Sequence, residues 1–177
     1  MSGQSMTGSA NDEATLPLKV WLALFSNVRQ IEWLIRTNLR ESFGSTLPRF
    51  DLLSQLYRVA DGMTMSELST RLMVSNSNVT GLIARLVAER LVSRVADPQD
   101  KRIQRVALTP KGRRVFETMI PANQAWVSAA MAGVPRDDLV ELQALLQKLK
   151  VSVSGAVQMH KAGEVPGDQD GPPWAAP

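Results

Sequence analysis

The stretch that decides the fold is DPQDKRIQRVALTPKG, residues 97–112. It opens on an Asp-Pro turn signal and continues into Ile103 to Leu108, which has the β-branched composition of a short strand. Leu91 to Val95, just before it, has the same composition, so two strands joined by a polar tip predict a β-hairpin. The Thr-Pro pair that follows suits the cap and first position of a new helix.

The positive charge of the chain is concentrated around this hairpin. Residues 85–114 contain nine Lys or Arg and three acids, a net charge of +6, whereas the whole 177-residue chain has a formal net charge of +3. A basic segment in an otherwise slightly acidic chain is typical of a face that binds a polyanion. The alternative is a solvated, salt-bridged surface, and charge alone does not decide between the two.

Composition excludes several classes of function. There is no cysteine, which rules out disulfides, thiol redox sensing, cysteine nucleophiles and thiolate-bound zinc. His160 is the one histidine, so we expect no metal site, no cofactor and, without any catalytic motif, no enzyme. No apolar run is long enough to span a membrane, and the polar, acidic start lacks the pattern of a signal peptide. We therefore expect a cytoplasmic protein without a membrane partner.

Helical periodicity surrounds the hairpin on both sides. Apolar residues recur at three- and four-residue steps from Leu16, which predicts a long helix ending near Gly44. Further helices are expected from Pro48 to Gly62, from the Thr64–Glu67 capping box to Leu72, from Asn76 to Arg90, from Pro110 to about Met131 with a kink or break at Pro121, and from Pro135 to Val153. The last of these carries a heptad-like leucine seam.

Two short helices joined by a tight turn and followed by a basic hairpin predict a winged helix-turn-helix. The expected fold is mainly α with a small β-hairpin, flanked by helices at both ends. Its predicted parts are a disordered tail over 1–15, a dimerisation helix over 16–44, a DNA-binding domain over 45–109, C-terminal dimerisation helices over 110–158 and a disordered tail over 159–177. The terminal helices are expected to pack against a second copy, although packing within one subunit is the alternative.

The helix over 76–90 is the predicted recognition helix, because short polar side chains at its start can approach base edges in the major groove. The candidate contacts are Ser75, Asn76, Ser77, Asn78, Thr80, Gly81 and Arg85. Gly81 costs helix stability, which either close approach to DNA or close packing against a neighbouring helix would explain. Arg85 suits a phosphate or a guanine, and its alternative role is an ion pair with Glu89.

The hairpin is the predicted wing. Its candidate DNA contacts are Arg94, Asp100, Lys101, Arg102 and Arg105. Arg102 at the tip suits the minor groove, where negative potential is strongest over narrow A·T-rich segments. Asp100 either holds the Arg102 guanidinium or bonds to its own backbone as a turn residue. Arg105 is expected to face the DNA backbone.

Residues 68–112 resemble the MarR family of bacterial transcription regulators. The family's wing pattern, D-x-x-D-x-R followed by a strand and L-T-x-x-G, is matched by Asp97, Asp100, Arg102, Leu108, Thr109 and Gly112. The resemblance implies a homodimer that binds a pseudo-palindromic double-stranded operator, usually as a repressor released by a small ligand. Arg90 departs from the pattern, because many members have glycine there, and we expect it to keep the turn while adding a charge. An activator and a winged helix used only for protein interactions are the alternatives.

Bulky aromatic residues near the terminal helices are candidates for an effector pocket. With possible carboxylate partners, the candidates are Trp21, Phe25, Arg29, Trp33, Arg49, Phe50 and Trp126. Arg36 and Arg40 are further possible carboxylate partners, and the aromatic residues are alternatively ordinary core. Within the MarR resemblance the implied effector is an aromatic carboxylate or its CoA thioester.

Overall fold

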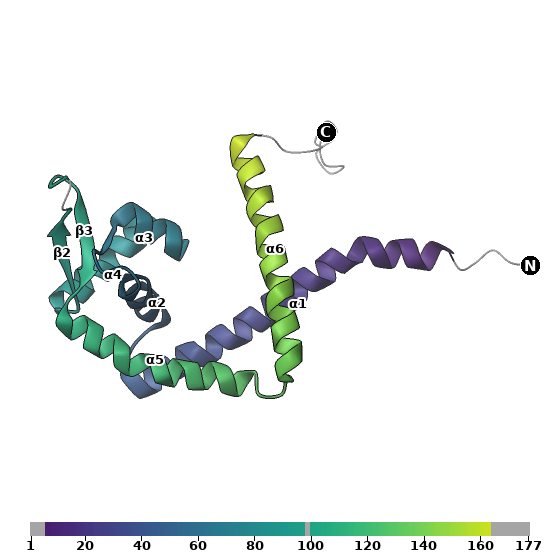
Figure 1. The fold of residues 1–177 in the computed structure, drawn as a ribbon, viewed down its shortest axis with the longest axis horizontal. Coiled ribbons are helices and arrows are strands. Elements are labelled where there is room, and N and C mark those ends of the chain that lie inside the picture. Colours follow the sequence, from purple (N-terminus) through teal and green to yellow (C-terminus); the bar gives the residue numbers. More distant parts are fainter. Residues whose placement is uncertain (1–5, 98–99, 164–177) are drawn as a thin grey trace, which may run out of the picture. The chain divides into compact units, whose positions relative to one another are not determined.

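The computed structural model describes residues 6–97 and 100–163 (Figure 1). Its elements are α1 (Met6–Phe43), α2 (Leu47–Tyr57), β1 (Met63–Thr64), α3 (Met65–Leu72), α4 (Asn76–Ala88), β2 (Val92–Ala96), β3 (Gln104–Leu108), α5 (Pro110–Ala130) and α6 (Arg136–Ala162). The chain divides into two compact units, the first ending at Ala130 and the second beginning at Met131. The predicted fold class is confirmed: helices dominate, with one small antiparallel sheet.

The sheet has three strands in the order β1-β3-β2, one more than the sequence predicted. β2 and β3 form the expected hairpin, with Val92 opposite Leu108. β1 pairs with β3 through Met63 opposite Val106, and its two residues are too few to produce an alternating pattern. Gly62, with φ +72°, allows this pairing because a Cβ there would overlap the Val106 carbonyl oxygen.

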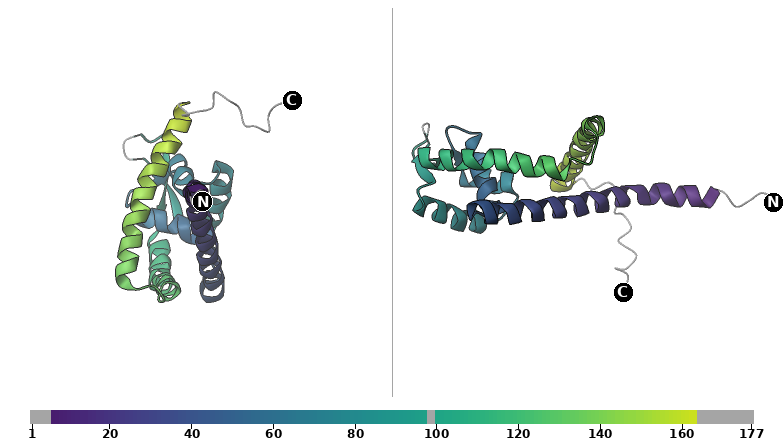
Figure 2. Two further views of the ribbon diagram at one scale, coloured as in Figure 1. Left: turned by 90° about the vertical axis from the view of Figure 1, so that its right-hand side faces the viewer. Right: turned by 90° about the horizontal axis from the view of Figure 1, so that it is seen from below.

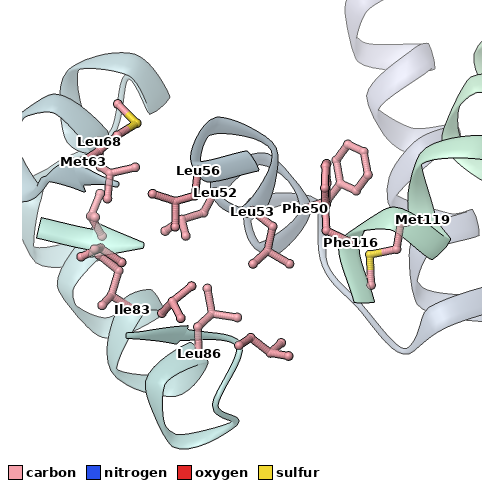
Figure 3. Packing of buried hydrophobic residues seen from close by; sticks show 14 of the residues in the cluster. Phe50, Leu52, Leu53, Leu56, Met63, Leu68, Ile83, Leu86, Phe116 and Met119 are labelled. Carbon is pink, nitrogen blue, oxygen red and sulfur yellow. The ribbon is translucent and has the colours of Figure 1, made fainter. Parts of the chain in front are cut away.

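One hydrophobic core joins the helix-turn-helix to parts of the flanking helices (Figure 3). α2 contributes the most, with three leucines that are completely or almost completely buried: Leu52, Leu53 and Leu56. Leu39 of α1 and Phe116 of α5 are buried in the same cluster, and the ring of Phe116 lies 5.2 Å from that of Phe50. The boundaries predicted at 44/45 and 109/110 therefore cut through one core.

The C-terminal half of α1 and the length of α5 lie side by side and run in opposite directions (Figure 2). Further toward its N-terminus α1 presents apolar side chains to solvent, among them Leu18, Trp21, Leu22 and Phe25. α6, taken by itself, is also apolar and exposed along its heptad seam, including Leu142, Leu146 and Leu149. Packing within the first compact unit thus covers only the C-terminal half of α1.

Several predicted boundaries need correction. α1 begins at Met6, so residues 6–15 are helical rather than disordered, because adding residues to an existing helix costs little compared with starting one. α6 extends to Ala162 and ends at Gly163 with φ +77°, which moves the predicted tail start at 159. Pro121 lies within a continuous α5 and does not break it. The other parts of both predicted tails, 1–5 and 164–177, are outside the described residues.

The capping box at the start of α3 is confirmed. The backbone N–H of Thr64 donates to the Glu67 carboxylate at 2.7 Å, and the backbone N–H of Glu67 donates to the Thr64 hydroxyl at 3.2 Å. The Thr64 hydroxyl also donates to the Glu67 carboxylate at 3.0 Å. The two bonds to that carboxylate, first that from the Thr64 backbone and then that from its hydroxyl, lower the pKa of Glu67. The box therefore fixes where α3 begins, directly after β1.

Arg90 occupies the left-handed region, with φ +59°, in the turn between α4 and β2. The sequence predicted that this residue keeps a turn usually made by glycine, and it does. An L-residue in this region is strained by about 1–2 kcal/mol, because its Cβ crowds the neighbouring carbonyl oxygen.

We therefore predict that Arg90→Gly raises the free energy of unfolding by about 1 kcal/mol, after allowance for the extra freedom of glycine in the unfolded chain. Urea denaturation followed by circular dichroism measures the change. Arg58→Gly is the matched control. Arg58, at the end of α2, has an ordinary φ of −82°, so this variant should be less stable than the wild-type protein. A loss of stability in both variants would contradict the strain at Arg90.

Candidate nucleic-acid interface

The inner and outer faces of α4 are sharply divided. Val79, Ile83 and Leu86 are completely buried, at the four- and three-residue spacing of one helix face. The predicted major-groove residues Ser75, Ser77, Asn78, Thr80, Gly81 and Arg85 are exposed. The side chain of Asn76, also predicted, lies outside the described part of the structure. Burial of the apolar face therefore leaves the small polar residues available to a ligand.

Two alternatives left open by the sequence are now decided. A Cβ at Gly81 would meet nothing within 4 Å, so this glycine does not serve close packing against another helix. Glu89 is occupied by Arg49, whose two terminal nitrogens donate to its two carboxylate oxygens, so Glu89 is not the partner of Arg85. Within the described residues, Arg85 makes no side-chain hydrogen bond or ion pair.

The wing tip is built by backbone hydrogen bonds across the turn. The Asp97 N–H donates to the Ile103 carbonyl, and the Ile103 N–H donates to the Asp100 carbonyl, both at 2.9 Å. The Asp100 carboxylate accepts from the backbone N–H of Arg102 at 3.0 Å, so it acts as a turn residue and does not hold the guanidinium. Arg94, Lys101 and Arg102 are exposed, and none has a side-chain partner among the described residues.

Arg105 does not take the predicted position facing DNA. Its Nε donates to the carboxylate of Asp97, which is only 7% exposed, and its Nη1 donates to the Gly62 carbonyl at 3.1 Å. Glu67 lies 3.7 Å from the same guanidinium. The bond to Asp97 raises the pKa of Arg105, so the charge is permanently present. Arg105 instead ties the wing to the turn before β1 and to the start of α3.

The L-T-P-K-G segment has a role that the sequence did not reveal. Thr109 caps α5, as predicted, by accepting from the Gly112 N–H at 3.0 Å, but its hydroxyl also donates to the Arg90 carbonyl at 2.7 Å. Lys111 donates to the Glu89 carbonyl at 2.9 Å. A Cβ at Gly112 would overlap the Leu91 carbonyl oxygen. The segment therefore holds the start of α5 against the turn that follows α4.

The predicted effector residues do not converge on one cavity. Trp21 and Phe25 stack on each other on exposed α1, while Phe50 is buried in the core. Trp33 and Arg29 are exposed, Trp126 packs edge-on against Phe43, and Arg49 is bound to Glu89. Helical periodicity predicts which element carries each aromatic residue, but it does not predict the relative directions of their side chains.

A cavity of about 500 Å³ lies instead between the start of α2 and α4. Its wall is largely apolar, with contributions from Pro48, Leu72, Val74 and Leu82. Asp51 and Arg85 supply charges of opposite sign, and Gly81 lines the α4 side. Burial raises the pKa of Asp51, Glu32 raises it further, and Arg36 opposes both. The outer face of α4 is thus shared by the cavity and by the predicted DNA surface.

Residues 6–97 and 100–163 contain no group of three or more His, Cys, Asp or Glu side chains placed to hold a metal ion. None of their helices combines the length and apolar character needed to cross a membrane.

Comparison with known proteins identifies close counterparts of this architecture. The MarR family profile matches residues 43–103. YsmB of Bacillus subtilis, an uncharacterised HTH-type transcriptional regulator, is 31% identical over 137 residues, which cover 76% of this chain and 93% of YsmB. The transcriptional activatory protein BadR of Rhodopseudomonas palustris is 33% identical over 116 residues, covering 64% of this chain and 66% of BadR. A solved MarR family regulator from Silicibacter pomeroyi has a TM-score of 0.69 at 27% identity, covering 80% of this chain and 98% of that one.

The contrast between Arg105 and Arg102 gives a stability prediction. Arg105→Met removes the ion pair of the nearly buried Asp97 carboxylate, which keeps only uncharged donors such as the Asp100 backbone N–H, so we expect the melting temperature to fall by about 3 °C or more. Arg102→Met removes an exposed side chain and should leave the melting temperature unchanged. Differential scanning calorimetry distinguishes the two, and equal melting temperatures for both variants would contradict the structural role of Arg105.

Proposed function

Since this chain belongs to the MarR family of DNA-binding transcription regulators, we propose that it acts as a homodimer on a pseudo-palindromic operator and responds to a small organic effector. Family membership also confirms that it is a regulator rather than an enzyme. The observation that carries the proposal is the exposed polar face of α4 beside a wing with unpaired cations. Both features belong to one compact unit, so they can meet one duplex together.

In the proposed complex the N-terminal part of α4 enters the major groove. Ser77, Asn78 and Thr80 are short enough to bring the helix close to base edges, and Gly81 leaves space for the same approach. Arg85 binds a phosphate or a guanine one turn further along. Arg102 enters the adjacent minor groove from the wing tip, with Arg94 and Lys101 supplying phosphate contacts.

The homodimer is supported by apolar surface that one chain leaves uncovered. Trp21 and Phe25 of α1 are each at least half exposed, and α6 has a line of exposed leucines and valines. Extended exposed apolar surfaces are uncommon on monomeric soluble proteins. A two-fold dimer through α1 and α6 buries them and presents two wings to two half-sites.

The effector is proposed to be an aromatic carboxylate or its CoA thioester, in line with the MarR resemblance. The cavity beside α4 offers an apolar wall for a ring and Arg85 for a carboxylate. A ligand there would take Arg85 away from DNA, which favours a repressor released by its effector. BadR is named as an activatory protein, so activation by the same fold is the second candidate.

We predict that Arg85→Ala and Arg102→Ala each weaken binding to a duplex selected by the wild-type protein from a random library, by about tenfold. Each should also reduce the slope of log affinity against log salt, by about 1 if the lost contact is to phosphate. Fluorescence anisotropy across a salt series measures both quantities. Arg40→Ala, an exposed arginine at the end of α1, should change neither. Unchanged affinity and slope in the two test variants would contradict the assigned DNA face.

The dimer predicts that Leu146→Asp in the α6 seam shifts the protein from dimer to monomer at micromolar concentration. A buried carboxylate without a partner opposes association strongly. Light scattering coupled to size exclusion gives the mass, and Glu141→Asp is the control on the exposed polar part of α6. A wild-type protein that is monomeric at this concentration would overturn the homodimer.

A further inference from the structure

The C-terminal end of α4 is held by a side chain from far along the sequence. Arg49, in the first turn of α2, donates from both terminal nitrogens to the two carboxylate oxygens of Glu89, forty residues away. Glu89 is the C-cap of α4. The hydrogen bond from Arg49 is the main cause of the lowered pKa of Glu89, so the pair is ionised at neutral pH.

The same short segment is held from α5. Lys111 donates to the backbone carbonyl of Glu89, and Thr109 donates to that of Arg90. Both α2 and α5 therefore bind the end of α4. The contact from α2 is to the Glu89 side chain, and the contacts from the start of α5 are to backbone carbonyls. Among the described residues, Arg49 is the one side chain of another helix that binds the Glu89 carboxylate.

The Arg49 guanidinium is costly to place here. Its Nε is buried and has no hydrogen-bond partner in the described part of the chain, while the side chain as a whole is 24% exposed. A buried donor without an acceptor opposes folding, and an apolar residue would avoid that cost. A bidentate pair, however, fixes distance and direction together, which an apolar contact does not.

Direction matters because α4 acts as a lever. A helix of 13 residues is about 20 Å long, so a small tilt at its last turn displaces the exposed residues of its first turns. Those residues and Arg102 on the wing must reach two grooves of one duplex at the same time.

We propose that Arg49 is a positioning residue for sequence recognition, which through Glu89 fixes the tilt of the recognition helix relative to α2. This rests on the proposed function, because it assumes that α4 reads DNA. Arg49 itself touches no base or phosphate in this arrangement. Its loss should therefore reduce discrimination between sequences and leave the general attraction to DNA unchanged.

The test compares Arg49→Gln, Glu89→Gln and the double variant on two probes. One probe is a duplex selected by the wild-type protein from a random library, and the other has the same length and composition with the selected site scrambled. Each single variant should bind the selected duplex about tenfold more weakly and the scrambled duplex within about twofold of wild type. The double variant should be no worse than either single variant. Arg40→Gln, which removes an arginine outside the pair, is the control for charge.

Positioning and net charge predict opposite changes in the affinity of Glu89→Gln for the selected duplex. Removing a negative charge should tighten binding to both probes if only net charge matters, whereas positioning predicts weaker binding to the selected duplex alone. Equal or tighter binding by Glu89→Gln would overturn the inference. Failure of the wild-type protein to select any sequence would instead overturn the proposed function.

Exchange of the two charges keeps the test valid if a single variant does not fold. The variant with Arg49→Glu and Glu89→Arg restores an ion pair across the same two helices. Recovery of discrimination to within about threefold of wild type supports positioning. A folded exchange variant, checked by circular dichroism, that still lacks discrimination would contradict it.

Discussion

The structure depends on the close contact between Gly112 at the start of α5 and the Leu91 carbonyl after α4. No side chain fits between the two backbones at this point, so the turn from the recognition helix into the wing lies directly on the next helix. Thr109 and Lys111 add hydrogen bonds to the carbonyls of Arg90 and Glu89. Three successive features, the helix end, the root of the wing and the start of α5, are thereby fixed by one short motif.

The basic charge around the hairpin is divided between two uses. Lys111 and Arg105 bind other parts of the chain, the first at the end of α4 and the second between Asp97 and the Gly62 carbonyl. Arg85, Arg94, Lys101 and Arg102 are exposed and unpaired in the described structure. The recognition helix and the wing therefore keep four cations that a polyanion can reach, while Lys111 and Arg105 hold these two elements in place.

Sequence patterns predicted the features that depend on local periodicity. The capping box at Thr64, the hairpin and the exposed start of α4 all follow from spacing and composition over a few residues. β1 was missed because two residues carry no period. Arg105 was misplaced because its pair with Asp97 forms across the hairpin, and its other partner, the Gly62 carbonyl, lies 43 residues away in the sequence. That the effector candidates do not meet in one cavity of the described chain has a related reason: aromatic content indicates bulk, but the direction of Phe50 into the core depends on Phe116 in another helix.

The open space around Gly81 bears on how proteins with this fold can evolve different DNA sequence preferences. Nothing in the described part of the chain lies within 4 Å of a Cβ at this position, and the outer residues Ser77, Asn78 and Arg85 are exposed. Substitutions there change what the helix presents to a duplex without disturbing the core formed by Val79, Ile83 and Leu86. The buried side of α4 is therefore constrained by folding and the exposed side by recognition. Mutations on the exposed side can change the DNA sequence preference during evolution while the fold stays the same.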